Sequence, residues 1–190
     1  MEQGTSTSRK NALRELFEWI KYLGVAVLIG IGLTTFVVQR NEVMGSSMDP
    51  TLKNGDQIVV QKLSRYWHGI DYGDIVTIHG SSVPGSEGTM DEDIIKRIIG
   101  CPGDHIQIMD NHVYLNDKLL EEPYLLSGTE TVQINEKWLD VKLGEDEYYV
   151  LGDNRNASRD SRDFGPVPHD AIIGELWFRM FPFEHCGGVE

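Results

Sequence analysis

Two short segments carry side chains that could do chemistry together, a serine in one and a lysine in the other. The first, MGSSMDPTLKNGD (44–56), contains Ser46 and Ser47, and a serine hydroxyl becomes a useful nucleophile only when a base removes its proton. The second, DIIKRIIGCPGD (93–104), places Lys96 in an apolar run. Burial disfavours a charged ammonium and lowers its pKa, so a buried lysine could serve as that base.

The histidines offer no evident alternative base. None of the 6 lies in a context typical of a Ser-His-Asp triad, and no GxSxG nucleophile elbow is present. The pattern around Lys96 has a second interpretation, in which the lysine points to solvent while the isoleucines point inward. Because side chains alternate along a strand, Lys96 and Arg97 lie on opposite faces, so one of them shares a face with Ile94 and Ile98.

A third segment, LGDNRNASRDSRDFG (151–165), is dense in Gly, Asp, Asn, Ser and Arg. Such residues hydrogen-bond to nearby backbone, which predicts a structured loop. A surface turn with salt bridges is the alternative. By itself the segment indicates only that part of the chain is held in an unusual conformation.

The elements that must position these groups begin with an apolar run near the N-terminus. Residues 22–38 carry no charge, and with Trp19 and Ile20 the run approaches the roughly 20 residues that cross a membrane. A buried core helix is the alternative. A cleaved signal peptide is disfavoured, because the run ends in FVVQRNEVMG where small residues are needed. We therefore expect an uncleaved transmembrane anchor over residues 19–39.

Basic residues flank this segment unequally and predict its orientation. The N-terminal side carries Arg9, Lys10, Arg14 and Lys21. The other side opens with Arg40, followed by an asparagine and a glutamate. The positive-inside bias then places residues 1–18 in the cytoplasm and residues 40–190 outside it. No second long apolar run follows, so a single span is expected.

After Arg40 the pattern is typical of strands. Short segments rich in Val, Ile and Tyr alternate in polarity and are separated by turn residues. Residues 110–111 (DN) and 116–117 (ND) are typical of hairpin turns, and 81–91 is typical of an exposed loop. Many short strands without intervening helices predict a mainly β domain. The expected strands are 57–63, 74–80, 93–100, 104–110, 112–120, 131–143, 147–153 and 171–181.

Composition excludes several other classes of protein. The net charge of −13 argues against a nucleic-acid partner, because phosphate binding needs clustered Lys and Arg. Cys101 and Cys186 are too few for a disulfide framework and fit no zinc pattern; they could pair in an oxidising compartment or remain thiols. No HExxH, P-loop or GxGxxG motif occurs, so we expect no metal, nucleotide or other cofactor.

Taken in order, these segments resemble type I signal peptidases, the bacterial enzymes that remove signal peptides from exported proteins. The family pattern is an anchor, then SMxPTL, a GDI strand, KR..G.PGD and GDNR..S.DSR..G. The four motifs begin here at Ser47, Gly73, Lys96 and Gly152. The resemblance covers nearly the whole chain and is to the single-span, Gram-positive-like branch. It implies folded antiparallel sheets of the signal-peptidase and LexA-like kind, with about residues 105–148 as an inserted β-ribbon subdomain.

The resemblance also assigns roles to individual residues. Ser47, which directly precedes Met-x-Pro, would be the nucleophile, and Lys96 the general base. Ser158 matches the serine that orients the lysine amine. The oxyanion hole would include the Ser47 N–H, but Gly45 stands where some family members place a serine hydroxyl as second donor. The residues that would support the loop around Ser158 are Asp153, Asp160 and Arg162.

The same resemblance implies a membrane-bound, monomeric serine endopeptidase in the plasma membrane, in contact with membrane lipid, that cleaves preprotein signal peptides through an acyl-enzyme. The substrate would lie extended beside the strand that carries Lys96. A shallow apolar pocket would admit only small side chains, so alanine is expected at positions −1 and −3. The residues matched to substrate binding are Val43, Met44, Gly45, Met48, Leu52 and Ile95.

Two other readings of the sequence remain. A self-cleaving Ser/Lys repressor-like protein would need a helix-turn-helix domain, whereas the first 40 residues read as an anchor. A non-catalytic homologue used as a binding scaffold would not need both Ser47 and Lys96. Both readings are therefore disfavoured against a signal-peptide protease.

Overall fold

The computed structural model describes residues 4–67, 69–85 and 91–189 of the chain. It divides into two compact units, with the boundary between Val38 and Gln39. The first unit is dominated by one helix, α1 (Gly4–Phe36). Within it, the 20 residues Arg14–Leu33 are long and apolar enough to cross a membrane. Residues 37–39 of the predicted anchor lie beyond the end of this helix.

The second unit is built on a seven-stranded sheet whose described strand pairs are antiparallel. Two of its middle strands, 75–78 and 94–100, are buried along almost their whole length, because they are covered on both faces. This architecture confirms the predicted mainly β fold class. In order across the sheet, the strands are β1 (Val38–Glu42), β2 (Gln57–Gln61), β11 (Ile172–Phe181), β3 (Ile75–Ile78), β4 (Ile94–Gly100), β9 (Glu147–Leu151) and β10 (Val167–Pro168).

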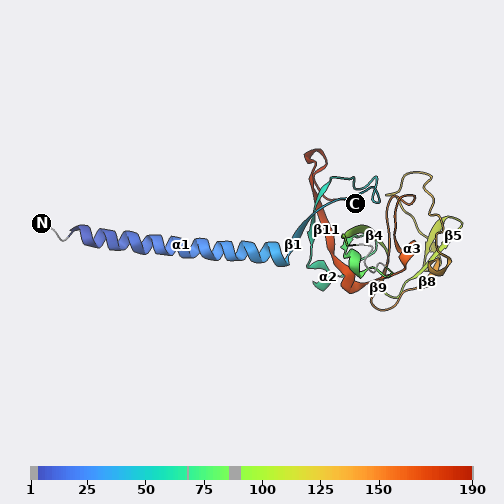
Figure 1. The fold of residues 1–190 in the computed structure, drawn as a ribbon, viewed down its shortest axis with the longest axis horizontal. Coiled ribbons are helices and arrows are strands. Elements are labelled where there is room, and N and C mark those ends of the chain that lie inside the picture. The colour runs from blue at the N-terminus through green and yellow to red at the C-terminus, as the bar shows by residue number, and fades with distance from the viewer. Residues whose placement is uncertain (1–3, 68, 86–90, 190) are drawn as a thin grey trace. The chain divides into compact units, whose positions relative to one another are not determined.

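A smaller four-stranded sheet is inserted between β4 and β9. Figure 1 shows its strands β5 and β8 at the end of this unit that lies away from β11. Residues 110, 111, 116 and 117 all have positive φ, which confirms both predicted hairpin turns, since such turns require that conformation. In order across this sheet, the strands are β7 (Lys118–Leu119), β6 (His112–Leu115), β5 (His105–Met109) and β8 (Asp140–Lys142).

One predicted strand is largely wrong. Of the segment 131–143, only Asp140–Lys142 forms a strand, and Glu136–Trp138 forms the 3-10 helix η2. The side chain of Asn135 accepts a hydrogen bond from the Lys137 N–H, and such local bonds compete with strand pairing. The predicted loop 81–91 can be followed only in part, because residues 86–90 lie outside the described residues.

Several short helices were not predicted. Four of them lie between strands of the larger sheet, and one of these four is at the end of the Asp- and Arg-rich segment 151–165; the fifth follows β11. They are α2 (Ser64–Trp67), α3 (Ser161–Phe164), and the 3-10 helices η1 (Gly80–Ser82), η3 (His169–Ala171) and η4 (Phe183–His185).

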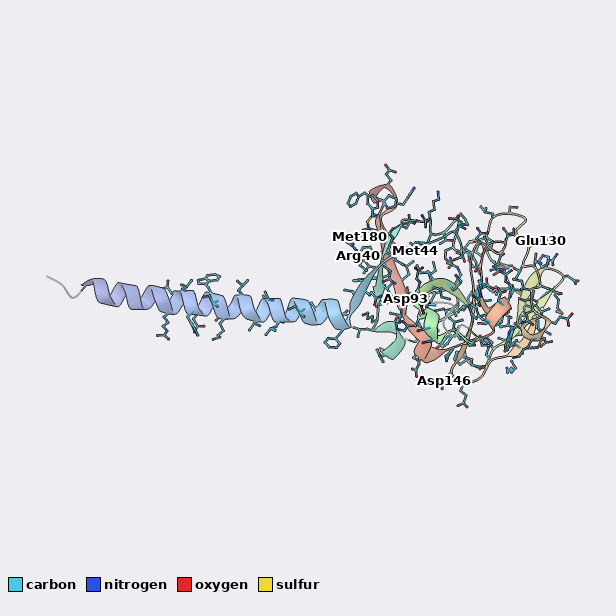
Figure 2. The ribbon with its side chains drawn as sticks, viewed as in Figure 1. Arg40, Met44, Asp93, Glu130, Asp146 and Met180 are labelled. Carbon is cyan, nitrogen blue, oxygen red and sulfur yellow. The ribbon has the colours of Figure 1, made fainter. Side chains whose placement is uncertain are left out.

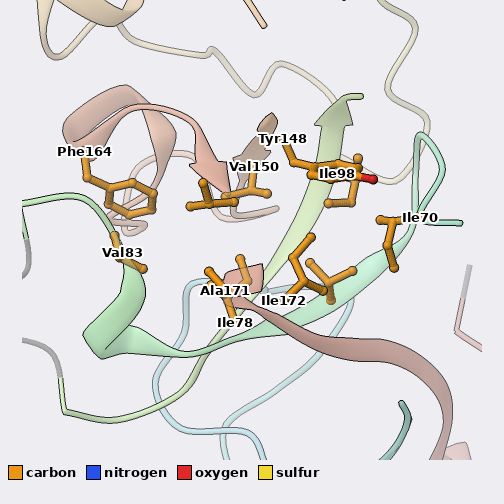
Figure 3. Packing of buried hydrophobic residues seen from close by; sticks show 11 residues of the cluster. Ile70, Ile78, Val83, Ile98, Tyr148, Val150, Phe164, Ala171 and Ile172 are labelled. Carbon is orange, nitrogen blue, oxygen red and sulfur yellow. The ribbon is translucent and has the colours of Figure 1, made fainter. Parts of the chain in front are cut away.

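Three apolar clusters hold the second unit together. The first, shown in Figure 3, joins β3, β4, β9 and β11 through residues such as Ile78, Ile98, Val150 and Ile172. The second lies under the Ser47 segment, and the third packs β4 and β9 against the small sheet. Strand β4 contributes to all three, so it is among the most firmly held parts of the fold.

Candidate active site

Ser47 and Lys96 meet although 49 residues separate them in the chain. The Lys96 amine lies 2.9 Å from Ser47 Oγ and also donates to the Ile95 carbonyl at 2.9 Å. Lys96 lies on β4, and the ladder pairs it with Val76 of β3. Only 3% of its surface is exposed, so the alternative of a solvent-facing lysine is wrong.

Burial sets the chemistry of this lysine. Desolvation lowers the pKa of Lys96 from 10.5 to about 8, and the negative charges of Asp160 and Asp153 oppose the shift only partly. Roughly a tenth of the molecules then carry a neutral amine at pH 7, against fewer than about one in a thousand for an ordinary lysine. A neutral amine beside a serine hydroxyl can take its proton.

The 152–154 segment holds the Ser46–Ser47 backbone in place by hydrogen bonds. The Asn154 N–H donates to the Ser47 carbonyl at 3.0 Å, and the Asn154 side-chain amide donates to the Ser46 carbonyl at 3.0 Å. Gly152 makes this close approach feasible, because a Cβ there would overlap both Ser158 Oγ and the Ser47 carbonyl.

Asp153 connects three of the four motifs found in the sequence, those that begin at Ser47, Lys96 and Gly152. Arg97, the neighbour of Lys96, donates to its carboxylate from Nε at 2.9 Å and from Nη2 at 2.7 Å. The Thr51 hydroxyl, four residues beyond Ser47, donates to the same carboxylate. The bidentate Arg97–Asp153 pair is buried. Together with the Thr51 bond, it fixes β4 relative to the segment that carries Ser47.

Asp160 and Arg162 form a second buried pair. Arg162 donates to the Asp160 carboxylate from Nε and Nη2, both at 2.8 Å. Asp160 also caps α3 and accepts from the Gly152 N–H at 3.1 Å. The pair therefore holds both ends of the loop that contacts Ser47.

Sequence reasoning missed a third ion pair. Arg155 of the same loop is buried and pairs with Glu122, which lies 33 residues earlier in the insertion. Arg155 also donates to the Thr131 hydroxyl and, at 3.1 Å, to the Gly152 carbonyl. A buried arginine needs a carboxylate partner, but no local pattern indicates which of the chain's acidic residues supplies it.

Ser158 is buried beside this loop, and its hydroxyl has no hydrogen-bond partner within the described part of the chain. The Lys96 amine is bonded instead to Ser47 and to the Ile95 carbonyl. The role that the family resemblance implies for Ser158, orienting the lysine amine, therefore stays a prediction.

The dyad opens into a groove of about 420 Å³. Its lining includes residues 41–44 and 92–95; Met44 and Asp93, one from each of these segments, are labelled in Figure 2. Of the residues predicted to bind substrate, four line this groove, namely Val43, Met44, Met48 and Ile95.

The other two residues predicted to bind substrate are placed differently. Leu52 is fully buried in the apolar cluster beneath the Ser47 segment. Gly45 is not part of the groove lining; it has φ +84°, and its N–H donates to Asn54 Oδ1 at 2.8 Å. The acidic side chains at the groove, which the sequence reasoning did not identify, belong to Glu42, Glu92 and Asp93.

Within the described ranges, no three His, Cys, Asp or Glu side chains are grouped so that they could hold a metal ion. Cys101 and Cys186 are both free thiols. Cys101 is half-buried and lies 3.6 Å from the Ile70 carbonyl, and burial raises its pKa to about 11. Neither thiol belongs to the Ser47 groove.

Comparison with known proteins identifies the family. The family model described as signal peptidase, peptidase S26, matches residues 16–181. The chain belongs to the S26 signal peptidases. It is 36% identical over 189 residues to the signal peptidase I of Bacillus licheniformis, with 96% of each chain covered. It is 35% identical over 185 residues to signal peptidase IB of Staphylococcus aureus, covering 90% of this chain and 92% of that protein.

Among solved structures, the crystal structure of a signal peptidase I from Enterococcus faecalis is 28% identical. It aligns with a TM-score of 0.46 and covers 56% of this chain and 96% of that one. Family membership makes this chain a serine peptidase with signal peptidase I function, as its motifs predicted. The apolar helix Arg14–Leu33 agrees with a membrane location.

Proposed function

We propose that this S26 signal peptidase cleaves signal peptides from exported preproteins by means of a Ser47/Lys96 dyad. The observation that carries the proposal is the 2.9 Å separation between Ser47 Oγ and the amine of a lysine that is 3% exposed. A serine held against a buried amine of lowered pKa has what acyl transfer requires, namely a nucleophile and an adjacent base.

The reaction follows from this pair. Neutral Lys96 takes the Ser47 proton while Ser47 Oγ attacks the carbonyl carbon of the scissile bond, and the carbonyl oxygen becomes an oxyanion. The resulting ammonium gives its proton to the leaving amine, and an acyl-enzyme remains on Ser47. Lys96 then deprotonates a water molecule that hydrolyses the ester, so the dyad returns to its starting state.

The groove is suited to an extended peptide. Residues 94–97 of β4 pair with β3, whereas the ladder with β9 begins at Arg97. The first half of β4 can therefore accept backbone hydrogen bonds from a peptide strand laid along the groove. Val43, Met48 and Ile95 are largely buried beside Ser47, which leaves room for small side chains such as alanine at positions −1 and −3.

The supporting residues would act through the loop. Asp153, Asp160 and Arg162 hold the main chain of residues 152–160, and Ser158 would orient the Lys96 amine by a rotation of its hydroxyl.

The protein would work as a single-span monomer, with residues 1–18 in the cytoplasm and residues 40–190 outside. The excess of basic residues before the helix supports this orientation.

The test is cleavage of a preprotein with an Ala-x-Ala site by the full chain in detergent. Ser47→Ala and Lys96→Met should each lower kcat by at least about 10⁴-fold, because each removes an indispensable member of the dyad. Ser46→Ala is the matched control, since Ser46 is adjacent and exposed, and only its carbonyl is used. Cleavage by Ser47→Ala at the rate of the unaltered protein would rule the proposal out.

A further inference from the structure

The peptide unit between Ser46 and Ser47 is held by a side chain that the mechanism above does not use. Asn154 Nδ2 donates to the Ser46 carbonyl at 3.0 Å. The main-chain N–H of the same Asn154 donates to the next carbonyl, that of Ser47, also at 3.0 Å. Asn154 therefore hydrogen-bonds to two consecutive peptide units at Ser47, to the first through its side chain and to the second through its backbone N–H.

The orientation of the first peptide unit determines where the Ser47 N–H points. In a trans peptide the carbonyl and the N–H point in opposite directions, so a bond that fixes the Ser46 carbonyl also fixes the Ser47 N–H. That N–H has no hydrogen-bond partner among the described residues, and Ser47 lines the groove. The Gly45 N–H, by contrast, already donates to Asn54. The Ser47 N–H is thus a free donor beside the reacting hydroxyl.

We infer that Asn154 is a positioning residue for the oxyanion hole, which holds the Ser47 N–H toward the oxygen on which negative charge develops. This inference rests on the proposed Ser47/Lys96 mechanism. Donors that are already aimed at the developing charge stabilise the transition state without reorganising during the reaction. Such aiming is needed here because Gly45, two residues before Ser47, has φ +84° and brings no side chain to restrain the turn.

A second bond limits the size of the effect. The Asp49 N–H also donates to the Ser46 carbonyl, at the longer distance of 3.2 Å. Loss of the Asn154 side chain would loosen the peptide unit without releasing it. The expected effect is therefore smaller than the about 10²- to 10³-fold loss in kcat that follows removal of an oxyanion donor itself.

The experiment compares Asn154→Ala and Asn154→Asp with Asn156→Ala and Asn156→Asp in the full detergent-solubilised chain. Asn156 lies on the same loop with an exposed side chain, so it controls for loop substitution and for added charge. Asn154→Ala should lower kcat by about 10- to 100-fold with little change in KM, since oxyanion contacts form only in the transition state. Asn154→Asp should lower kcat further, because a carboxylate oxygen would face the Ser46 carbonyl.

Three readouts separate positioning from a general structural role. A substrate-like peptide aldehyde adds Ser47 Oγ to its carbonyl carbon and forms a tetrahedral adduct, so its affinity should fall in parallel with kcat. Binding of an uncleaved peptide to the Ser47→Ala protein should be the same with and without Asn154→Ala. The acidic limb of the pH–rate profile should not move, because Lys96 is untouched. Rates are normalised to the folded fraction measured by circular dichroism.

The outcomes are distinct from those that test the dyad. If Ser47→Ala cleaves normally, the proposed function fails. If Ser47→Ala is inactive but the Asn154 variants match the Asn156 variants within about twofold, only the present inference fails. The inference would also be overturned if the Asn154 variants raised KM without lowering kcat, or if they shifted the acidic limb of the pH–rate profile.

Discussion

Lys96 and Arg97 are neighbours on β4, each is only 3% exposed, and yet their surroundings differ. Arg97 makes a bidentate pair with Asp153, donates to the Gly73 carbonyl and lies 4.0 Å from the centre of the Tyr124 ring. Within the described residues, the Lys96 amine hydrogen-bonds to two neutral groups, the Ser47 hydroxyl and the Ile95 carbonyl. The same strand thus buries one cation with its counterion and the other without.

The same contrast, between cations with and without a bonded carboxylate, extends to the segment 151–165. Each of its buried arginines, Arg155 and Arg162, also has its own carboxylate partner. The two carboxylates whose charges act on the Lys96 pKa, those of Asp160 and Asp153, are already bonded to arginines, and they oppose the fall in that pKa without reversing it. Among the buried cations of the described residues, the paired arginines hold the geometry, and Lys96, which has no bonded carboxylate, has a lowered pKa that suits base catalysis.

The strongest test of this contrast removes a paired cation. Arg162→Met should lower the free energy of unfolding by about 3–5 kcal/mol, because it leaves the Asp160 carboxylate buried without its partner. Chemical denaturation of the detergent-solubilised protein measures the loss. Arg159→Met is the control, since Arg159 is exposed on the same loop. A loss below about 1 kcal/mol would show that the pair is not needed for stability.

The opposite result is expected at the unpaired cation. At pH 7 Lys96 is mostly protonated in both the folded and unfolded states, so the folded state bears the cost of burying the charge. A fall in pKa from 10.5 to about 8 corresponds to about 3 kcal/mol. Lys96→Met should therefore raise the free energy of unfolding at pH 7 by up to that amount, while it abolishes cleavage.

This stabilisation has a defined pH dependence. As pH rises from about 8 to 10.5, the folded lysine loses its proton while the unfolded lysine keeps it, so the unaltered protein gains stability. The difference between Lys96→Met and the unaltered protein should shrink over that window, as measured by denaturation at a series of pH values. A Lys96→Met protein that is less stable at pH 7 would contradict the account of an unpaired, desolvated lysine.

The smallest effect concerns rate against pH. Since only the neutral amine can take the Ser47 proton, kcat/KM should rise about tenfold per pH unit below about 8 and level off above it. A preprotein cleavage assay over pH 5–10 measures this limb. A limb centred near 6.5, the ordinary pKa of histidine, would indicate a different base.

Local chemistry determined much of the fold. The hairpin turns at 110–111 and 116–117 follow from residues that tolerate positive φ, and most strands follow from alternation and β-branched residues. The segment 131–139 could not be assigned in this way. Its Val and Ile residues suit a strand, but the Asn135 side chain caps a turn instead.

For the site, the sequence by itself predicted that Ser47 and Lys96 act together, because both lie in motifs that follow one another in the order found in the family. Only the tertiary structure decided that Lys96 is buried, because alternation places Lys96 and Arg97 on opposite faces without saying which face is covered. The tertiary structure also brought together Arg155 and Glu122 as an ion pair, and the Asn154 side chain with the Ser46 carbonyl as a hydrogen bond. These contacts join residues far apart in the chain, and local sequence patterns carry no information about such partners.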